Sequence, residues 1–134
     1  MSPTQSTACS GGGGEINTHN VLPLLHEIRH ALGQWLQGGE ATVIDLRGIP
    51  MAPGEEEQLI ARLGGGEIQA RLSALGDSEI VETAYPGVWL VTHRNTDGEV
   101  IGRYIEVCEI PQILKAQQED VRAGLQRLEA ELGR

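Results

Sequence analysis

The chain has 134 residues, a formal net charge of −9 from 10 basic and 19 acidic residues, and no phenylalanine. This length fits a single domain. The acidic balance argues against nucleic acid and against anionic membrane surfaces, because binding to either depends on clustered Lys and Arg. Two cysteines, Cys9 and Cys108, are too few for a four-cysteine zinc site or a thiolate-held iron–sulfur cluster. We therefore expect no bound cofactor.

Residues 1–18 are rich in Ser, Thr and Gly, with four consecutive glycines at 11–14. Such a composition predicts a flexible tail, because it cannot bury enough apolar surface to become ordered. The segment lacks the basic and apolar regions of a secretory signal, and the chain has no apolar stretch long enough for a transmembrane helix. We expect a cytoplasmic protein in which residues 19–134 form one domain.

The first predicted helix follows a cap at Thr18 or Asn20 and ends at Gly38 and Gly39. Its apolar residues recur at helical spacing and form one stripe: Leu22, Leu25, Ile28, Leu32, Trp35 and Leu36. Residues 41–46 are a compact apolar run, typical of a buried strand. A second helix opens at Pro53, with three glutamates in its first turn.

Four further strands are predicted near residues 67–74, 79–85, 87–94 and 99–108, with a hairpin turn at residues 95–98. A terminal helix begins at Pro111, is broken around residues 117–119, and is capped again by Asp120. Its second half carries an apolar seam: Val121, Leu125, Leu128 and Leu132. This order predicts an α+β fold with a mostly antiparallel four- to five-stranded sheet and helices packed mainly on one face.

The segment His26–His30 matches the H-E-x-x-H pattern of zinc proteases, in which two histidines bind Zn²⁺ and the intervening glutamate activates water. On a helix wheel His26 falls on the flank of the apolar stripe and His30 nearly opposite it. The pair therefore mostly faces water, and a third ligand is not evident. A minimal zinc-dependent hydrolase using His26, His30 and Glu27 is kept as the alternative function.

The segment Tyr85–Trp89 contains a Pro-Gly bend between two strands, flanked by aromatic residues of a kind that often anchor protein interfaces. Whether Trp89 is exposed depends on the hairpin register. A two-residue turn at Asp97 and Gly98 places Trp89 opposite Glu106. A bulged type I turn places Trp89 opposite Ile105, on the apolar face. With Tyr104 and Glu106, the aromatic residues Tyr85 and Trp89 form the predicted partner-binding set.

Other polar residues favour structural roles. Asp45 and Arg47 at a strand end are expected to form an internal ion pair. The carboxylates Glu82, Glu106 and Glu109 are expected on a polar sheet face, since a glycosidase would need a cleft lined with aromatics. Cys108 is expected to be a buried and unreactive thiol.

Four segments carry a resemblance to a known family: TVIDLRGIP (42–50), GEIQARL (66–72), SEIVETAYPGVW (78–89) and YIEVCEIPQIL (104–114). They resemble the C-terminal region of the HupH/HyaF family, accessory proteins for the maturation of nickel–iron hydrogenases, in order from about Leu22 to about Leu128. The resemblance implies a non-catalytic, chaperone-like protein that binds the precursor of the hydrogenase iron–sulfur small subunit, and other maturation proteins as further partners. Longer members carry an additional N-terminal region, so this chain is expected to hold only part of the full activity.

A third hypothesis is self-association, with the terminal helix seam as the contact of a homodimer.

Overall fold

The computed structural model describes residues 19–133. The predicted flexible tail of residues 1–18, with Cys9 and the alternative cap Thr18, lies outside the described residues, as does Arg134. The described chain forms an open, five-stranded antiparallel sheet with strand order β1-β5-β4-β3-β2. Its strands are β1 (Thr42–Asp45), β2 (Gln69–Ala74), β3 (Gly76–Glu82), β4 (Val88–Arg94) and β5 (Val100–Val107).

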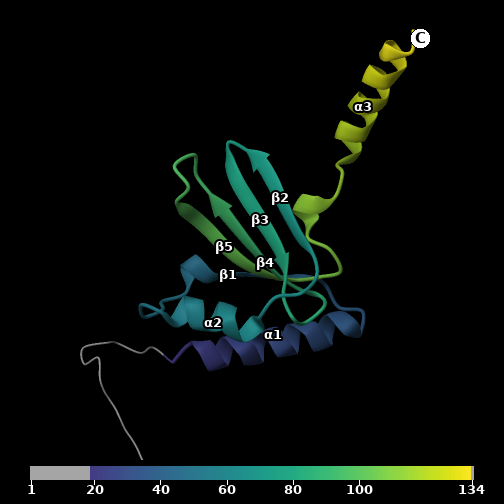
Figure 1. Cartoon of the computed structure of the whole chain (residues 1–134). Coiled ribbons are helices and arrows are strands. Elements are labelled where there is room, and N and C mark those ends of the chain that lie inside the picture. Colours follow the sequence, from purple (N-terminus) through teal and green to yellow (C-terminus); the bar gives the residue numbers. More distant parts are fainter. Residues whose placement is uncertain (1–18, 134) are drawn as a thin grey trace, which may run out of the picture.

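Two helices, α1 (Val21–Leu36) and α2 (Glu55–Leu63), lie together across one face of the sheet, whereas α3 (Gln118–Glu131) points away from it (Figure 1). The α+β prediction is therefore confirmed. Short 3₁₀ turns, η2 (Leu46–Gly48) and η3 (Gln112–Leu114), follow β1 and precede α3. None of the helices in residues 19–133 is long and apolar enough to cross a membrane.

The terminal helix is broken as the sequence predicted, but its first part is only the 3₁₀ turn η3. The predicted cap is wrong: Gln117 occupies the cap position of α3, and Asp120 lies in the first turn, where an acidic group favours the helix dipole. The cap position of α1 is Asn20, whose side-chain amide donates to the carbonyl oxygen of Pro50 and not to the helix itself.

The buried face of α1 is rotated from the predicted stripe. Its buried residues are Val21, Leu24, Ile28 and Ala31, while Leu22 and Leu36 are exposed. The helix contacts both α2 and β5 of the sheet, so its buried side is set by two neighbours and not by one. The predicted stripe was centred on other apolar residues of the same helix and therefore missed Val21, Leu24 and Ala31.

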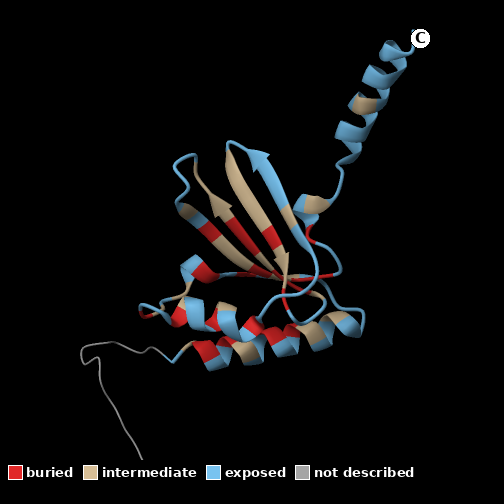
Figure 2. Ribbon diagram, viewed as in Figure 1, coloured by how far each residue is buried: buried red, intermediate tan, exposed pale blue. Residues whose placement is uncertain are grey.

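The sheet separates two apolar clusters, because successive side chains of a strand point to opposite faces. On the helix side, Val88, Ile105 and Val107 pack against α1 and α2. On the opposite face, Ile80, Trp89, Val91 and Cys108 form a second cluster, partly covered by Tyr104 and by Leu114 of η3. Buried residues accordingly lie along the inner sides of the helices and the middle of the sheet (Figure 2).

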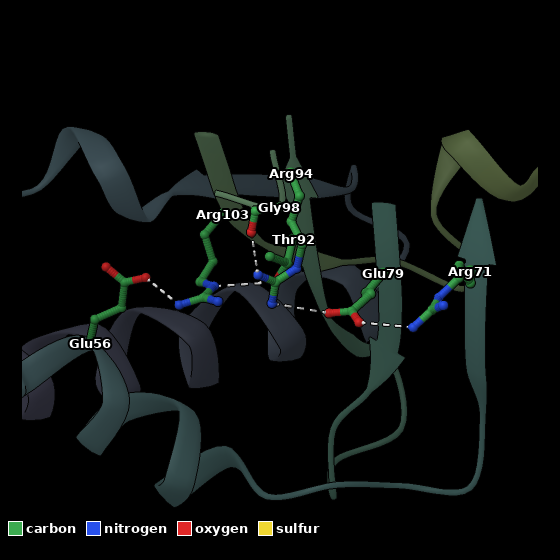
Figure 3. A network of polar contacts seen from close by, with 7 residues as sticks. All are labelled: Glu56, Arg71, Glu79, Thr92, Arg94, Gly98 and Arg103. Atoms are coloured by element: carbon green, nitrogen blue, oxygen red, sulfur yellow. Dashed lines mark hydrogen bonds and ion pairs between the residues drawn. The ribbon is translucent and has the colours of Figure 1, made fainter. Parts of the chain in front are cut away.

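A polar network ties α2 to the sheet beyond the apolar core (Figure 3). The Arg103 guanidinium on β5 is 2.8 Å from the Glu56 carboxylate in the first turn of α2, and it also donates to the Thr92 hydroxyl. Further along the same face, Arg94 and Arg71 flank Glu79 at 3.5 and 3.6 Å.

Candidate functional site

The β4–β5 hairpin combines both registers that the sequence left open. The turn is the bulged type I form: the Gly98 amide donates to the Asn95 carbonyl, and Gly98 has a φ of +84°. That turn alone would place Trp89 opposite Ile105. A second irregularity pairs Arg94 with Val100 but His93 with Gly102, leaving one extra residue in β5. This shift returns Trp89 to a position opposite Glu106.

Trp89 is consequently a core residue despite its polar partner, because it faces the second apolar cluster and is only 4% exposed. Its indole Nε1 donates to the carbonyl oxygen of Cys108 at 3.2 Å. In this position the ring supports the surface above it and does not itself present a face to a partner.

Above this cluster lies what we call the open-face cluster: Ser78, His93, Tyr104 and Glu106. The His93 and Tyr104 rings meet edge to face at 5.7 Å, and His93 Nδ1 lies 2.7 Å from the Ser78 hydroxyl. Gly102 lies opposite His93 on β5, and a Cβ there would come within 3.3 Å of the Tyr104 ring. A glycine at this position therefore lets the two rings pack together.

Burial governs the two titratable groups next to this cluster. It raises the pKa of Glu106, and the nearby His93 partly opposes that shift. Burial also raises the pKa of the Cys108 thiol, as does the negative charge of Glu106, while Lys115 acts in the opposite direction. A thiol of this kind is a poor nucleophile at neutral pH, which agrees with the structural role expected for Cys108.

Tyr85 lies apart from the other three predicted partner-binding residues. It belongs to the β3–β4 loop, where the Thr83 hydroxyl donates to the carbonyl oxygen of Val88 at 2.8 Å and accepts from the Tyr85 amide. Gly87 in the same bend has a φ of +94° and packs close to Leu32 of α1. These contacts hold the loop against the helices and leave the Tyr85 side chain 51% exposed.

Tyr85 forms one wall of a groove of about 300 Å³ between the loop, α1 and α2, which we call the α1–α2 groove. The exposed Arg29 and Arg62 lie at its edge. Its floor is apolar and consists of Leu25, Ile28, Leu32, Leu63 and Val88. Neither guanidinium has an ion-pair partner among residues 19–133. The groove thus combines an apolar floor with two unpaired positive charges on a strongly acidic protein.

The H-E-x-x-H residues occupy the solvent side of α1. His26, Glu27 and His30 are all exposed, while the opposite side of the helix packs into the core. Within the part of the chain that the structure describes, no group of three or more His, Cys, Asp or Glu is placed to bind a metal ion.

The predicted ion pair of Asp45 and Arg47 is wrong. Asp45 instead accepts a hydrogen bond from the Arg47 backbone amide at the start of η2, and the guanidinium donates to the carbonyl oxygen of Val100. Both residues nevertheless have structural roles, because they close the turn after β1 and fasten it to β5.

The three carboxylates considered for glycosidase chemistry are dispersed. Glu82 and Glu106 lie on β3 and β5, which are separated by β4, and Glu82 accepts a hydrogen bond from the Glu67 amide. Glu109 is exposed beyond the end of β5. Glu82 and Glu106 both pair in register with Trp89 and share the face of the second apolar cluster, so that face is mixed and not polar as predicted.

The sequence interpretation missed the α1–α2 groove. Arg29 lies inside the H-E-x-x-H segment, whose recognisable pattern is carried by the two histidines, and Arg62 is a basic residue in the last turn of α2. Their convergence depends on how α1 packs against α2, which the spacing of residues within either helix does not specify.

Comparisons with known proteins identify a family. Residues 18–133 match the model of the HupH hydrogenase expression protein, C-terminal conserved region. The chain is 33% identical over 128 residues to the hydrogenase expression/formation protein HupH of Rhizobium leguminosarum bv. viciae, covering 90% of this chain and 45% of that protein. It is 31% identical over 110 residues to the hydrogenase-1 operon protein HyaF of Escherichia coli, covering 81% and 38%.

A solved structure shares the fold. The hydrogenase expression protein HupH from Thiobacillus denitrificans superposes with a TM-score of 0.82 at 43% identity, covering 87% of this chain and 98% of that chain. The chain spans less than half the length of the curated relatives it matches.

Proposed function

The chain belongs to the family of the HupH hydrogenase expression protein C-terminal conserved region, and from this membership we propose that it is a non-catalytic, chaperone-like protein that helps to assemble a nickel–iron hydrogenase. The observation that carries the proposal is the match over residues 18–133 to proteins named for hydrogenase expression and formation. We propose the precursor of the iron–sulfur small subunit as its client and other maturation proteins as further partners.

The α1–α2 groove is our proposed client-binding surface. Its floor of leucine, isoleucine and valine side chains offers apolar contact, and Tyr85 supplies an exposed aromatic anchor at its wall. The unpaired Arg29 and Arg62 favour an acidic group next to the apolar contact, because each can donate charge-assisted hydrogen bonds to a carboxylate. The groove therefore suits a client segment that carries apolar side chains next to an acidic residue.

The open-face cluster is a weaker candidate for the same contact. Tyr104 and Glu106 are only half-buried, but the Tyr104 ring already packs against His93, and Trp89 beneath them is buried. A partner binding there would gain little new apolar contact from these side chains. Of the four residues predicted from the sequence, Tyr85 is the one best placed to touch a client.

Co-purification tests the proposal. The protein is tagged at its C-terminus and expressed in its own host with hydrogenase induced, and the proteins eluted with it are identified by mass spectrometry. We expect the small-subunit precursor to be recovered with the unaltered chain. Loss of one aromatic anchor costs about 1–2 kcal/mol or more, so Tyr85→Ala, and separately Arg29→Glu combined with Arg62→Glu, should lower that recovery roughly tenfold.

Matched variants locate the surface. His30→Ala alters an exposed residue on the solvent side of α1 and should leave recovery unchanged. Tyr104→Phe keeps the ring of the open-face cluster and should also have little effect. Failure to recover any hydrogenase component at low salt would refute the client assignment. Recovery that is lost in Tyr104→Phe but kept in Tyr85→Ala would refute the α1–α2 groove as the binding surface.

A further inference from the structure

Helix α3 has an apolar side that nothing in the described chain covers. It extends from the body of the protein with no strand or helix beside it (Figure 1), and none of its residues is buried (Figure 2). Three apolar side chains on this side and a fourth at the C-cap position are between 54% and 71% exposed: Val121, Leu125, Leu128 and Leu132. An exposed row of large apolar side chains on a free-standing helix marks an interaction surface.

The spacing of these residues is that of a coiled-coil seam. They follow one another at intervals of four, three and four residues, which places Leu125 and Leu132 at a positions and Val121 and Leu128 at d positions of a heptad. Gln118 occupies the preceding a position. A seam confined to a and d positions packs best against another helix of the same kind, because each side chain inserts between side chains of the facing helix.

The charges beside the seam select the orientation of that second helix. With this heptad assignment Arg122 and Glu129 occupy e positions, and Gly124 and Glu131 occupy g positions. In a parallel pair of identical helices g faces e of the next heptad, which sets Gly124 against Glu129 and forms no ion pair. In an antiparallel pair e faces e, so Arg122 of each copy meets Glu129 of the other. Neither side chain has an ion-pair partner among residues 19–133.

We propose that α3 is a self-association helix that pairs antiparallel with α3 of a second copy, with the seam at its centre and two Arg122–Glu129 ion pairs along the side where the e positions meet. Because α3 projects from the body, antiparallel pairing places the two bodies at opposite ends of the helix pair (Figure 1). Eight Val and Leu side chains at about 100 Å² each would bury on the order of 800 Å². Stable interfaces bury roughly 1,200–2,000 Å², so the dimer is weak and depends on concentration.

Sedimentation velocity on the full 134-residue chain tests the proposal, with protein concentration varied over roughly 100-fold around a dissociation constant between about 10 µM and 1 mM. We expect the unaltered chain to shift from monomer to dimer across this range. Leu125→Asp should remain monomeric. Arg122→Glu alone, and Glu129→Arg alone, should each raise the dissociation constant roughly tenfold, because two attractive pairs become two repulsive ones.

Mixing the two charge variants gives the decisive measurement. Equal amounts of Arg122→Glu and Glu129→Arg restore both opposite-charge pairs in the mixed dimer, so association should return to the level of the unaltered chain. Arg127→Glu and Glu119→Arg make the same charge changes at c and b positions and should leave association unchanged. A chain that stays monomeric at every concentration would overturn the proposal. So would a dimer that survives Leu125→Asp, or a mixture of charge variants that associates no better than either alone.

Discussion

The Arg103–Glu56 ion pair should contribute measurably to stability, because it is short and largely removed from water. The two charged groups are 2.8 Å apart, and their side chains are only 15% and 20% exposed. Exposed pairs contribute about 0–1 kcal/mol, whereas removing one partner of a buried pair costs about 3–5 kcal/mol. At this intermediate burial we expect Glu56→Gln or Arg103→Met to lower the free energy of unfolding by about 2–3 kcal/mol.

A double-mutant cycle separates the pair from the side chains themselves. Urea unfolding followed by circular dichroism is measured for the unaltered chain, both single variants and the double variant, and we expect a coupling energy of about 1–2 kcal/mol. Arg71→Met is the matched control, because Arg71 is 64% exposed and lies 3.6 Å from Glu79; it should cost about 0.5 kcal/mol or less. If Arg103→Met costs no more than Arg71→Met, the pair adds nothing and apolar packing alone holds α2 to the sheet.

Three further predictions concern backbone fit and titration. Gly76→Ala should cost more than about 2 kcal/mol, because Gly76 has a φ of +104° and a Cβ there would overlap the carbonyl oxygen of Arg94. Gly98→Ala, with a φ of +84° and open space around it, should cost only about 1 kcal/mol in the same unfolding assay; equal costs would contradict the overlap. Burial raises the pKa of Glu106, so the native state holds this proton more tightly than the unfolded chain, and the stabilisation present at low pH is lost as pH rises through the native pKa. On going from about pH 4 to about pH 7, the free energy of unfolding of the unaltered chain should therefore fall relative to that of Glu106→Gln. Urea unfolding at both pH values measures this difference, and a change in the opposite direction would refute the prediction. Alkylation at Cys108, located by mass spectrometry, should be slow at neutral pH in the native protein and fast in urea; rapid native labelling would contradict its burial.

The types of the elements and their order along the chain could be predicted from the sequence because they depend on local signals. The place of β1 beside β5 could not, because it pairs residues about 60 positions apart. Alternation of side chains, a hairpin turn at Asn95–Gly98 and glycines after each of the first two helices specify where elements begin and end. The register of Trp89 could not be predicted in this way. It depends on an extra residue in β5, Ile101, which compensates for the bulged turn. Ile101 is exposed in the structure, but nothing in the sequence around it marks it as the extra residue.

The candidate surfaces were predictable to different degrees, for a physical reason. The seam of α3 is a property of one helix, so its four apolar residues were evident from spacing alone, although the sequence did not show that the helix stands clear of the body. The α1–α2 groove is formed by three separate segments. Its two arginines converge only when α1 and α2 pack side by side and the Tyr85 loop closes against them, and no local pattern records that geometry.

The separation of these two surfaces has a consequence for how the protein would act. Helices α1 and α2, which line the groove, lie below the sheet, and α3 extends beyond its other end (Figure 1). A client in the groove and a second copy at α3 therefore do not compete. A dimer formed through α3 would carry two grooves, and a client with two acceptable segments, or a complex of two clients, would then bind more tightly than to one groove alone. If both proposals hold, Leu125→Asp should lower client recovery without altering the groove, whereas Tyr85→Ala should lower client recovery without altering dimerisation.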